Sequence, residues 1–458
     1  MLAAVNNFLK YVDDLVWGVP LIVAILLTGI YLTIRLKGIQ ITKLPKALKY
    51  MFENEESGHG EVTSFGALCT ALSATIGTGN IVGVATAIVA GGPGALFWME
   101  IAALFGMATK YSEGLLAIKY RTTDKHGHIL GGPFYYIENG MGKKWTWLAK
   151  IFAFFGMGVG LFGIGTFTQV NGITSAVGNF FDPNAQNVIH LLGRDYTLAV
   201  VISGLILTVC VGLVVIGGLK RIAKVSEIVV PFMAVIYITI SLLLLILNAN
   251  KIPAAIVEIV SSAFGLRAAA GGALGAIIVA MQKGIARGIF SNEAGLGSAP
   301  IAAAAAQTKE PARQGLVTMT GLSIVITGSW NIGLEGVAVT TNAFQHGLPF
   351  APQVSAFLLM MCLVFFAFTT ILGWDYYSER CLAYLSGSNK TALKIFRWLY
   401  IAAVFIGPYF TVSAVWVIAD IFNALMAIPN LIALLSLSGV VVAETQSYLK
   451  RMNLTRVK

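Results

Sequence analysis

The sequence is a succession of long apolar runs separated by short polar loops, and this pattern constrains the fold more than any other feature. About 20 consecutive apolar residues are enough for an α-helix to cross the hydrocarbon core of a bilayer. Such runs lie near 18–36, 63–90, 94–118, 146–178, 196–217, 226–248, 269–290, 314–334, 354–384, 394–410 and 413–443. The sequence therefore predicts an all-α polytopic membrane protein with about 11 transmembrane helices.

Composition excludes several other classes of protein. Charged residues make up 11% of the chain, whereas soluble domains carry about 25%. The net charge of +10 comes from Lys and Arg in short loops, so we expect no nucleic-acid binding. The four cysteines have no zinc or disulfide spacing, and we find no nucleotide-binding or catalytic motif. We expect a protein that is neither an enzyme nor a primary pump.

The basic loops predict the orientation of the chain. Lys and Arg gather after the first, third, fifth, seventh and ninth runs and in the tail. The positive-inside rule then places the N-terminus outside and the C-terminus in the cytoplasm of a cell-membrane protein. An odd number of spans fits this orientation. Pro429 should kink or break the last run, so 12 spans are the alternative to 11.

The spacing of the runs suggests an internal repeat. After one extra N-terminal helix, five runs precede and five follow the middle of the chain, so the two halves are inverted relative to each other. We predict an N-terminal helix with an inner-surface amphipathic segment (1–62), two five-helix repeats (63–250 and 251–445) and a basic cytoplasmic tail (446–458). A short apolar segment near 253–264 is expected to cap the outer side. Each repeat opens with a glycine-rich, interrupted helix, which is typical of transporter sites at the bilayer midplane.

The first interrupted helix carries the most informative residues. Gly77, Gly79 and Gly83 weaken the helix, and unwound backbone in a membrane needs a cavity or a ligand. The amides of Thr78 and Gly79 then point at an anion such as a carboxylate. The freed carbonyls before them are hard oxygen ligands for a small cation. The alternative is close helix packing through small residues.

Other polar groups in the apolar runs are weaker candidates. Thr369 and Thr370 can bond to their own helix or ligate a cation. Gln169 must face the protein interior, where it either joins two helices or contacts a ligand. We place the second interruption near Gly275 to Gln282. Beyond it, Arg287 could pair with Glu293 as a gate latch, or this polar run could simply order the helix end.

Several long motifs resemble the alanine or glycine:cation symporter family. They are Gly77-Thr78-Gly79-Asn80-Ile81-Val82-Gly83, Gly91-Gly92-Pro93-Gly94, Gly131-Gly132-Pro133, Arg287-Gly288-Ile289-Phe290-Ser291-Asn292-Glu293-Ala294-Gly295 and Met426-Ala427-Ile428-Pro429-Asn430. The resemblance covers almost the whole chain. It implies membership of the amino acid/polyamine/organocation superfamily and the five-plus-five inverted-repeat fold of the bacterial leucine transporter, with two discontinuous helices.

The resemblance also implies roles for individual residues. The substrate-binding set is Thr78, Gly79, Asn80, Phe167, Gln169, Met281, Gln282 and Trp374. The sodium ligands are Ser73, Ile76, Phe366, Thr369 and Thr370, with Thr75 and Asn80 at a second sodium site.

The implied function is sodium-coupled import of alanine and glycine by alternating access, in which sodium is co-transported. A proton-coupled or uniporting carrier of the same fold is the alternative, and an amino acid sensor or a channel is a more distant one. The sequence leaves open the sodium stoichiometry, the preference for L- or D-alanine and the oligomeric state.

Overall fold

A computed structural model describes residues 8–9, 11–13, 15–43, 64–123, 129–191, 193–265, 272–304, 337–409 and 412–455. The first part of the chain forms α2 (Val19–Arg35), α3 (Ile39–Thr42), α5 (Ser64–Thr75), η1 (Thr78–Asn80), α6 (Val82–Gly91), α7 (Gly94–Lys119), α8 (Pro133–Tyr135), η2 (Tyr136–Gly140), η3 (Lys143–Trp145), α9 (Thr146–Phe162) and α10 (Phe167–Phe181). It continues with α11 (Leu198–Val215), α12 (Leu219–Leu247), η4 (Ala249–Lys251), α13 (Ile252–Ala263), α14 (Ala273–Asn292), α15 (Ala299–Ala303), α17 (Val337–Gly347), α18 (Pro352–Ser386), α19 (Lys390–Ile406), η6 (Gly407–Tyr409), α20 (Val412–Ser436) and α21 (Ser438–Thr455).

Helices occupy every predicted apolar run that the structure describes, which confirms the all-helical membrane fold. The predicted run at 314–334 lies outside the described residues. Within them, seven helical segments are long and apolar enough to cross a membrane: Lys143–Phe181, Leu198–Val215, Lys220–Leu247, Leu274–Asn292, Pro352–Ser386, Lys390–Tyr409 and Ala419–Ser436. The first of them contains both α9 and α10. Val19–Arg35 and Val82–Gly91 are shorter apolar helices.

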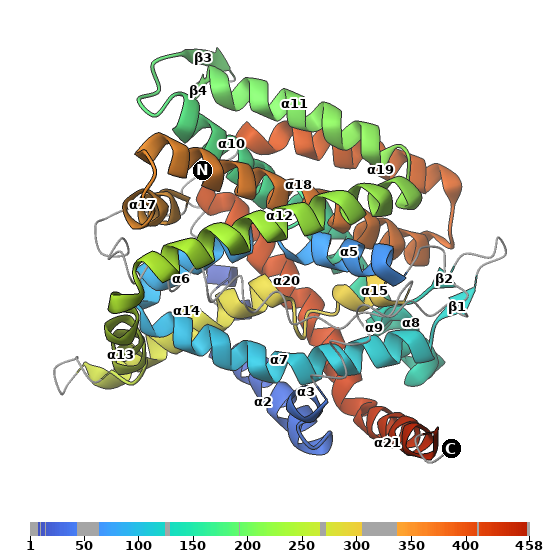
Figure 1. The fold of residues 1–458 in the computed structure, drawn as a ribbon. Helices are drawn as coiled ribbons and strands as arrows, with labels where there is room; N and C mark the ends of the chain where they lie inside the picture. Colours follow the sequence, from blue (N-terminus) through green and yellow to red (C-terminus); the bar gives the residue numbers. More distant parts are fainter. Residues whose placement is uncertain are drawn as a thin grey trace.

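The long helices run between two ends of the bundle (Figure 1). The α13 and α17 helices and a β3–β4 hairpin (Val188–Leu191 and Arg194–Thr197) lie at one end, and α8 with a β1–β2 hairpin (Thr122–Thr123 and Ile129–Leu130) lies at the other. Both hairpins are short loop structures that the apolar pattern did not predict. The outward faces of α11 and α12 expose large apolar side chains suited to lipid, among them Ile202, Leu205, Val209, Phe232, Val235 and Ile246.

The predicted cap segment is a helix in the structure. The α13 helix lies across the start of α7, where Gly94 N–H donates to Ser262 Oγ at 3.0 Å and Trp98 Nε1 donates to the carbonyl of Ala263 at 3.3 Å. At the other end of the chain, α20 continues through Pro429 to Ser436. The break that Pro429 was expected to introduce is therefore absent, and the chain turns into α21 only after α20 ends.

The position predicted for the second interruption is wrong. The α14 helix runs without a break from Ala273 to Asn292, through the whole of the segment from Gly275 to Gln282. The helix is instead interrupted between Glu293 and Ser298, where Gly295 and Gly297 take φ values of +89° and +78°. The α14 helix ends at Glu293, its C-cap, at a φ of +53°. Glycine adopts positive φ angles without steric cost, so Gly295 and Gly297 allow the turn that follows, whereas Gly275 sits in open space within the helix.

A further interruption divides the run at 146–178 into α9 and α10. The chain turns between Gly163 and Thr166, and Gly165 N–H donates to the carbonyl of Val159 at 3.2 Å. This turn starts a new helix just before Gln169, whereas the apolar pattern predicts one continuous span. The turn sets the direction of α10 and therefore which of its side chains face the core.

The α5 and α18 helices approach each other closely in the core. A Cβ atom built on Gly373 would lie 2.5 Å from the Cα of Ala74, which is main chain and cannot move aside. The absence of a side chain at Gly373 therefore sets the separation of these two helices. One turn earlier on α18, Thr370 reaches the end of α5.

Replacing Gly373 by Ala should lower the stability of the protein because the added methyl group forces α5 and α18 apart. Overpacking of this kind costs about 1–3 kcal/mol. The matched control is Gly275→Ala, which adds a methyl group in open space within α14 and should be neutral or slightly stabilising. Thermal unfolding in detergent measures both. A loss of stability in Gly275→Ala equal to that in Gly373→Ala would contradict the continuous helix.

Candidate functional site

The first interrupted helix opens at Gly77 in the centre of the bundle. The α5 helix ends at Thr75, Gly77 is extended, and η1 follows directly. Thr78 and Asn80 are fully buried. The amide of Thr78 donates to Gln169 Oε1 of α10 at 3.0 Å. An unwound amide that would otherwise face an anion thus points at a side-chain oxygen in the interior.

Oxygen atoms gather on the other side of the same break. The hydroxyl of Thr370 lies 2.9 Å from the carbonyl oxygen of Ser73, 3.1 Å from that of Ile76 and 3.0 Å from that of Phe366. Thr369 Oγ1 also lies 3.0 Å from the carbonyl of Phe366. A hydroxyl has one proton to donate, so it can satisfy only one of these three carbonyls at a time.

This oxygen cluster fits a small hard cation. Carbonyl and hydroxyl oxygens are the ligands that such cations prefer, and the cluster joins α5 to α18 across the interruption. All five groups that were predicted as sodium ligands lie within it: the carbonyls of Ser73, Ile76 and Phe366 and the hydroxyls of Thr369 and Thr370. Thr369 in addition faces Met233 Sδ of α12 at 3.6 Å.

The second interruption brings a carboxylate to the same region. Glu293 follows α14, has a φ of +53° and is 1% exposed. Its Oε2 accepts from Ser298 Oγ at 2.7 Å and lies 3.5 Å from Thr75 Oγ1, and its Oε1 accepts from Trp374 Nε1 at 3.2 Å. Thr75 belongs to α5 and Trp374 to α18, so this side chain contacts both helices that form the oxygen cluster.

A second buried carboxylate fixes the unwound backbone after Glu293. Glu113 Oε1 of α7 accepts from the amide of Gly295 at 3.1 Å and from Asn430 Nδ2 at 2.6 Å. Asn430 Nδ2 also donates to the carbonyl of Gly295 at 2.9 Å, and Tyr136 donates to Asn430 Oδ1. The interruption is thus held by both an acceptor and a donor from its surroundings, as buried backbone requires.

The end of α14 packs directly on the first interruption. Ser291 Oγ donates to Asn80 Oδ1 at 2.8 Å. A Cβ atom built on Gly79 would lie 3.1 Å from the ring of Phe290, so this ring packs directly on the glycine. Arg287 stacks on the Phe290 ring at 5.5 Å and forms a two-fold ion pair with Asp420 of α20, at 3.1 and 3.0 Å. The structure therefore gives Asp420 as an ion-pair partner of Arg287.

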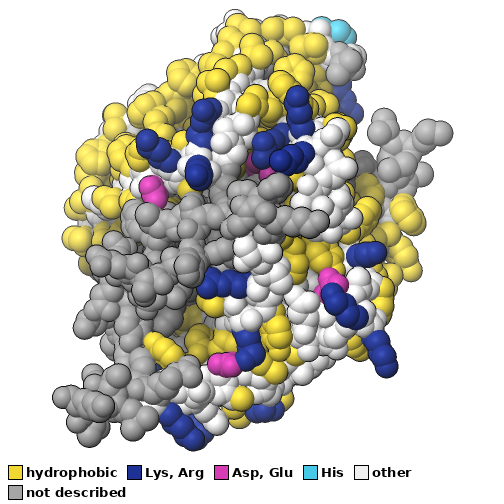
Figure 2. Space-filling view, turned by 90° about the vertical axis from the view of Figure 1, so that its right-hand side faces the viewer, with side chains coloured by type: hydrophobic (Ala, Val, Ile, Leu, Met, Phe, Trp, Pro, Cys, Tyr) yellow, Lys and Arg dark blue, Asp and Glu magenta, His cyan; other side chains and the backbone are white. Residues whose placement is uncertain are grey.

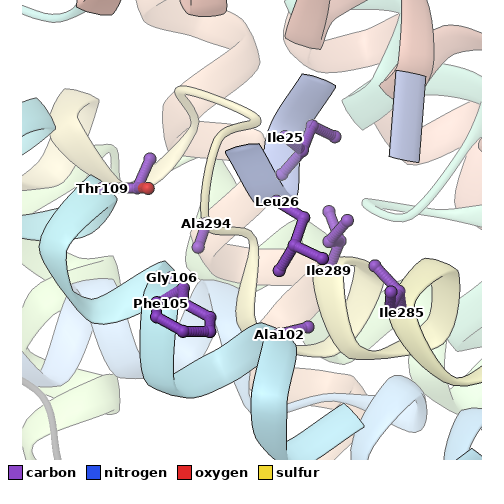
Figure 3. Close-up of a pocket in the computed structure, with 9 residues that line it drawn as sticks. All are labelled: Ile25, Leu26, Ala102, Phe105, Gly106, Thr109, Ile285, Ile289 and Ala294. Atoms are coloured by element: carbon purple, nitrogen blue, oxygen red, sulfur yellow. The ribbon is translucent and has the colours of Figure 1, made fainter. Parts of the chain in front are cut away.

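A small pocket lies beside this site (Figure 3). Side chains of α2, α7 and α14 line it, together with Ala294. The lining residues are Ile25, Leu26, Ala102, Phe105, Gly106, Thr109, Ile285, Ile289 and Ala294. Among these lining residues Thr109 alone has a polar side chain, so the pocket suits an apolar group rather than a zwitterion.

The sequence matches the sodium:alanine symporter family over residues 2–457. It is 44% identical to the sodium/alanine symporter AgcS of Methanococcus maripaludis, over 96% of this chain and 97% of that protein. The chain belongs to the sodium:alanine symporter family. It is also 51% identical to an uncharacterized transporter of Haemophilus influenzae (98% and 97% covered) and 36% identical to the probable sodium/glutamine symporter GlnT of Bacillus subtilis (96% and 90% covered).

The fold of this symporter family member is that of the five-plus-five transporters. The crystal structure of MhsT in complex with L-phenylalanine superposes with a TM-score of 0.53 at 12% identity, over 84% of this chain and 98% of that one. Together with the family match, this makes the protein a multi-pass membrane transporter of a sodium-coupled amino acid symporter family, and not an enzyme.

The structure brings together most, but not all, of the predicted site residues. Thr78, Gln169, Thr75, Asn80 and Trp374 meet around the first interruption. Phe167 is buried at the start of α10, with its ring 6.0 Å from that of Phe162.

Met281 and Gln282 lie further from the break than expected. Gln282 precedes Phe290 by eight residues, about 12 Å along an α-helix, and both side chains are half-buried. Their role as pocket walls stays a prediction.

The sequence did not predict the contacts that four residues make at the site: Phe290, Ser291, Glu293 and Asn430. The first three lie in the polar run after Arg287, which was read as a latch or a helix end. Asn430 was quoted only within a family motif. A buried Glu or Asn in an apolar run was the available signal, but its partners lie on helices far away in the sequence.

Replacing Asn430 by Ala should destabilise the protein because Glu113 and the backbone of Gly295 lose their bonds to its amide. Leaving such buried groups unsatisfied costs about 2 kcal/mol or more. Thermal unfolding and amide exchange near Gly295 measure the effect. The matched control is Asn423→Ala on the same helix, whose amide has no hydrogen-bond partner in the described part of the chain. Equal losses in the two variants would show that volume alone matters.

Proposed function

We propose that this protein imports alanine and glycine together with sodium by alternating access. One observation carries the proposal: Gly77 separates the oxygen cluster from the amide that would hold a carboxylate. A Cβ atom built on Gly77 would lie 2.6 Å from Thr370 Oγ1 and 2.9 Å from Gln169 Oε1, so both side chains lie against this glycine. A cation and an anion bound on the two sides of Gly77 would be close enough to stabilise each other.

The proposed roles follow the geometry of the two sides. The amides of Thr78 and Gly79 hold the substrate carboxylate, in place of the Gln169 oxygen that the Thr78 amide now contacts. Sodium binds the carbonyls of Ser73, Ile76 and Phe366 and the hydroxyls of Thr369 and Thr370. Thr75 and Asn80 are proposed for a second sodium ion.

The size of the substrate is inferred from the surrounding side chains. Phe290 packs against Gly79, and Trp374 lies one turn beyond Thr370 on α18, fully buried. Bulky walls on both sides favour a side chain no larger than a methyl group. The named alanine symporter AgcS at 44% identity supports alanine, whereas GlnT at 36% identity is named for glutamine.

Coupling follows from the position of the cation site between two helices. A cation among these oxygens joins α5 to α18 and fixes the orientation of the amides that follow Gly77. Sodium and substrate therefore raise each other's affinity. Each sodium ion that enters down a potential of 100 mV supplies about 2.3 kcal/mol, before any concentration term.

Uptake into proteoliposomes tests the proposal. Labelled alanine should accumulate with an inward sodium gradient and should not accumulate when potassium replaces sodium. Alanine-dependent uptake of labelled sodium should accompany it. Uptake driven equally well by a proton gradient without sodium would favour the proton-coupled alternative. Equilibration without accumulation would favour a uniporter, and a binding protein would show no uptake.

Replacing Thr370 by Val should raise the sodium concentration needed for half-maximal uptake by about tenfold or more, because the cluster loses the oxygen nearest all three carbonyls. Uptake measured over a range of sodium concentrations gives this value. The control is Thr28→Val on α2, where the hydroxyl bonds only to its own helix in the described structure, at Ala24. An unchanged sodium dependence in Thr370→Val would contradict the assigned site.

We also propose that the N-terminus lies outside the cell and the C-terminus in the cytoplasm. Figure 2 looks onto the end of the bundle that carries α8 and the β1–β2 hairpin, where Lys and Arg are widespread and Asp and Glu are few. The positive-inside rule favours this end as the cytoplasmic one. A C-terminal epitope in intact cells should resist added protease and become cleavable after permeabilisation. Cleavage in intact cells would reverse the orientation.

A further inference from the structure

Basic side chains gather where three apolar helices reach one end of the bundle. The span Leu198–Val215 ends there, and the spans Lys220–Leu247 and Lys390–Tyr409 begin there. The β1–β2 hairpin lies at the same end (Figure 1). The basic residues are Lys220, Arg221 and Lys224 of α12 and Lys390, Lys394 and Arg397 of α19. Their position at the ends of spans places them at the level of lipid head groups.

The turn between α11 and α12 brings the two basic helices together. A Cβ atom built on Gly217 would lie 2.6 Å from Arg221 Cζ. One built on the next residue, Gly218, would lie 3.7 Å from Arg397 Nη2. Arg221 Nη1 also donates to the carbonyl of Leu213 at 2.6 Å, which fixes its side chain over this turn. Two guanidinium groups from different helices therefore lie against one turn.

This basic surface carries more positive charge than the protein around it neutralises. Glu379 accepts from Arg397 Nε and Nη2 at 2.6 and 2.8 Å. The four lysines and Arg221 are exposed, and they form no ion pair with any residue that the structure describes. An anion is therefore the ligand whose charge complements this surface.

The same helices carry exposed apolar side chains beside the basic ones. On α19, Trp398 follows Lys394 by four residues and is 58% exposed. On α12, Ile228 follows Lys224 by four residues and is 67% exposed. Residues four apart lie on one face of a helix, so each face changes from basic to apolar toward the middle of its span. A molecule with an anionic head and an apolar tail matches both parts of the surface.

We propose that this surface binds a phospholipid with an anionic head group. The phosphate lies against Arg221 and the lysines of α12 and α19, and the acyl chains lie along Trp398 and Ile228. Basic sites between membrane helices bind anionic head groups in this way. A soluble anion would gain the attraction of the charges but not the apolar contact. None of these residues belongs to the proposed sodium or substrate site, so the proposal stands apart from the proposed function.

Native mass spectrometry of the purified protein tests the proposal with dioleoylphosphatidylglycerol and dioleoylphosphatidylcholine, which share their acyl chains and differ in head-group charge. The wild-type protein should retain the anionic lipid more tightly than the neutral one. In the double variant Lys220→Gln/Lys224→Gln, the ratio of the two affinities should fall by about tenfold or more, because two positive charges are lost. Both side chains are exposed, so the variant should fold, which thermal unfolding checks.

The matched control is Lys144→Gln/Lys150→Gln, which removes two exposed lysines from the start of α9 and the segment before it. It loses the same net charge and should keep the wild-type ratio. Arg221→Gln should lower the ratio by about fivefold. Glycerophosphate, which has the charged group without the acyl chains, should not displace the anionic lipid.

Three outcomes overturn the proposal. The ratio could stay at the wild-type value in both Lys220→Gln/Lys224→Gln and Arg221→Gln. It could fall equally in the Lys144→Gln/Lys150→Gln control, which would show that net charge alone attracts the lipid. Glycerophosphate could displace the anionic lipid at equal concentration, which would assign the surface to a soluble anion.

Discussion

The contact of the Thr370 hydroxyl with three main-chain carbonyls holds the centre of this protein together. Two of the carbonyls belong to the end of α5 and one to α18. The contact exists because Gly373 lets the two helices approach to main-chain distance. A single proton shared among three acceptors leaves the cluster rich in negative potential. The same feature that closes the helices thus gathers oxygen acceptors in the gap between them.

The sequence predicted the first interruption and its oxygen cluster well. Gly77 and Gly79 stand close together in an apolar run, and the unwinding they permit exposes groups of their own segment, so the signal is local. The Thr369–Thr370 pair was similarly visible as two adjacent hydroxyls in an apolar helix. The family resemblance then supplied the pairing of the two segments, which local reasoning alone left open.

The second interruption was misplaced because a glycine does not by itself mark a break. Gly275 lies in open space within a continuous helix, whereas Gly295 and Gly297 have positive φ angles in the turn that follows the helix. Their surroundings come from α7 and α20, through Glu113 and Asn430. Contacts between such distant segments leave no trace in hydropathy. The break was therefore expected earlier in α14 than the interruption that the structure shows.

The bond between Gln169 and the Thr78 amide has a consequence for the transport cycle. A symporter must return empty after each delivery, and it must not carry sodium alone. With the side-chain oxygen of Gln169 on this amide at 3.0 Å, the unwound segment has an internal acceptor when no substrate is present. The empty carrier can close without burying a bare amide. On the proposed assignment of the Thr78 amide to the substrate carboxylate, Gln169 would compete with the substrate for that amide.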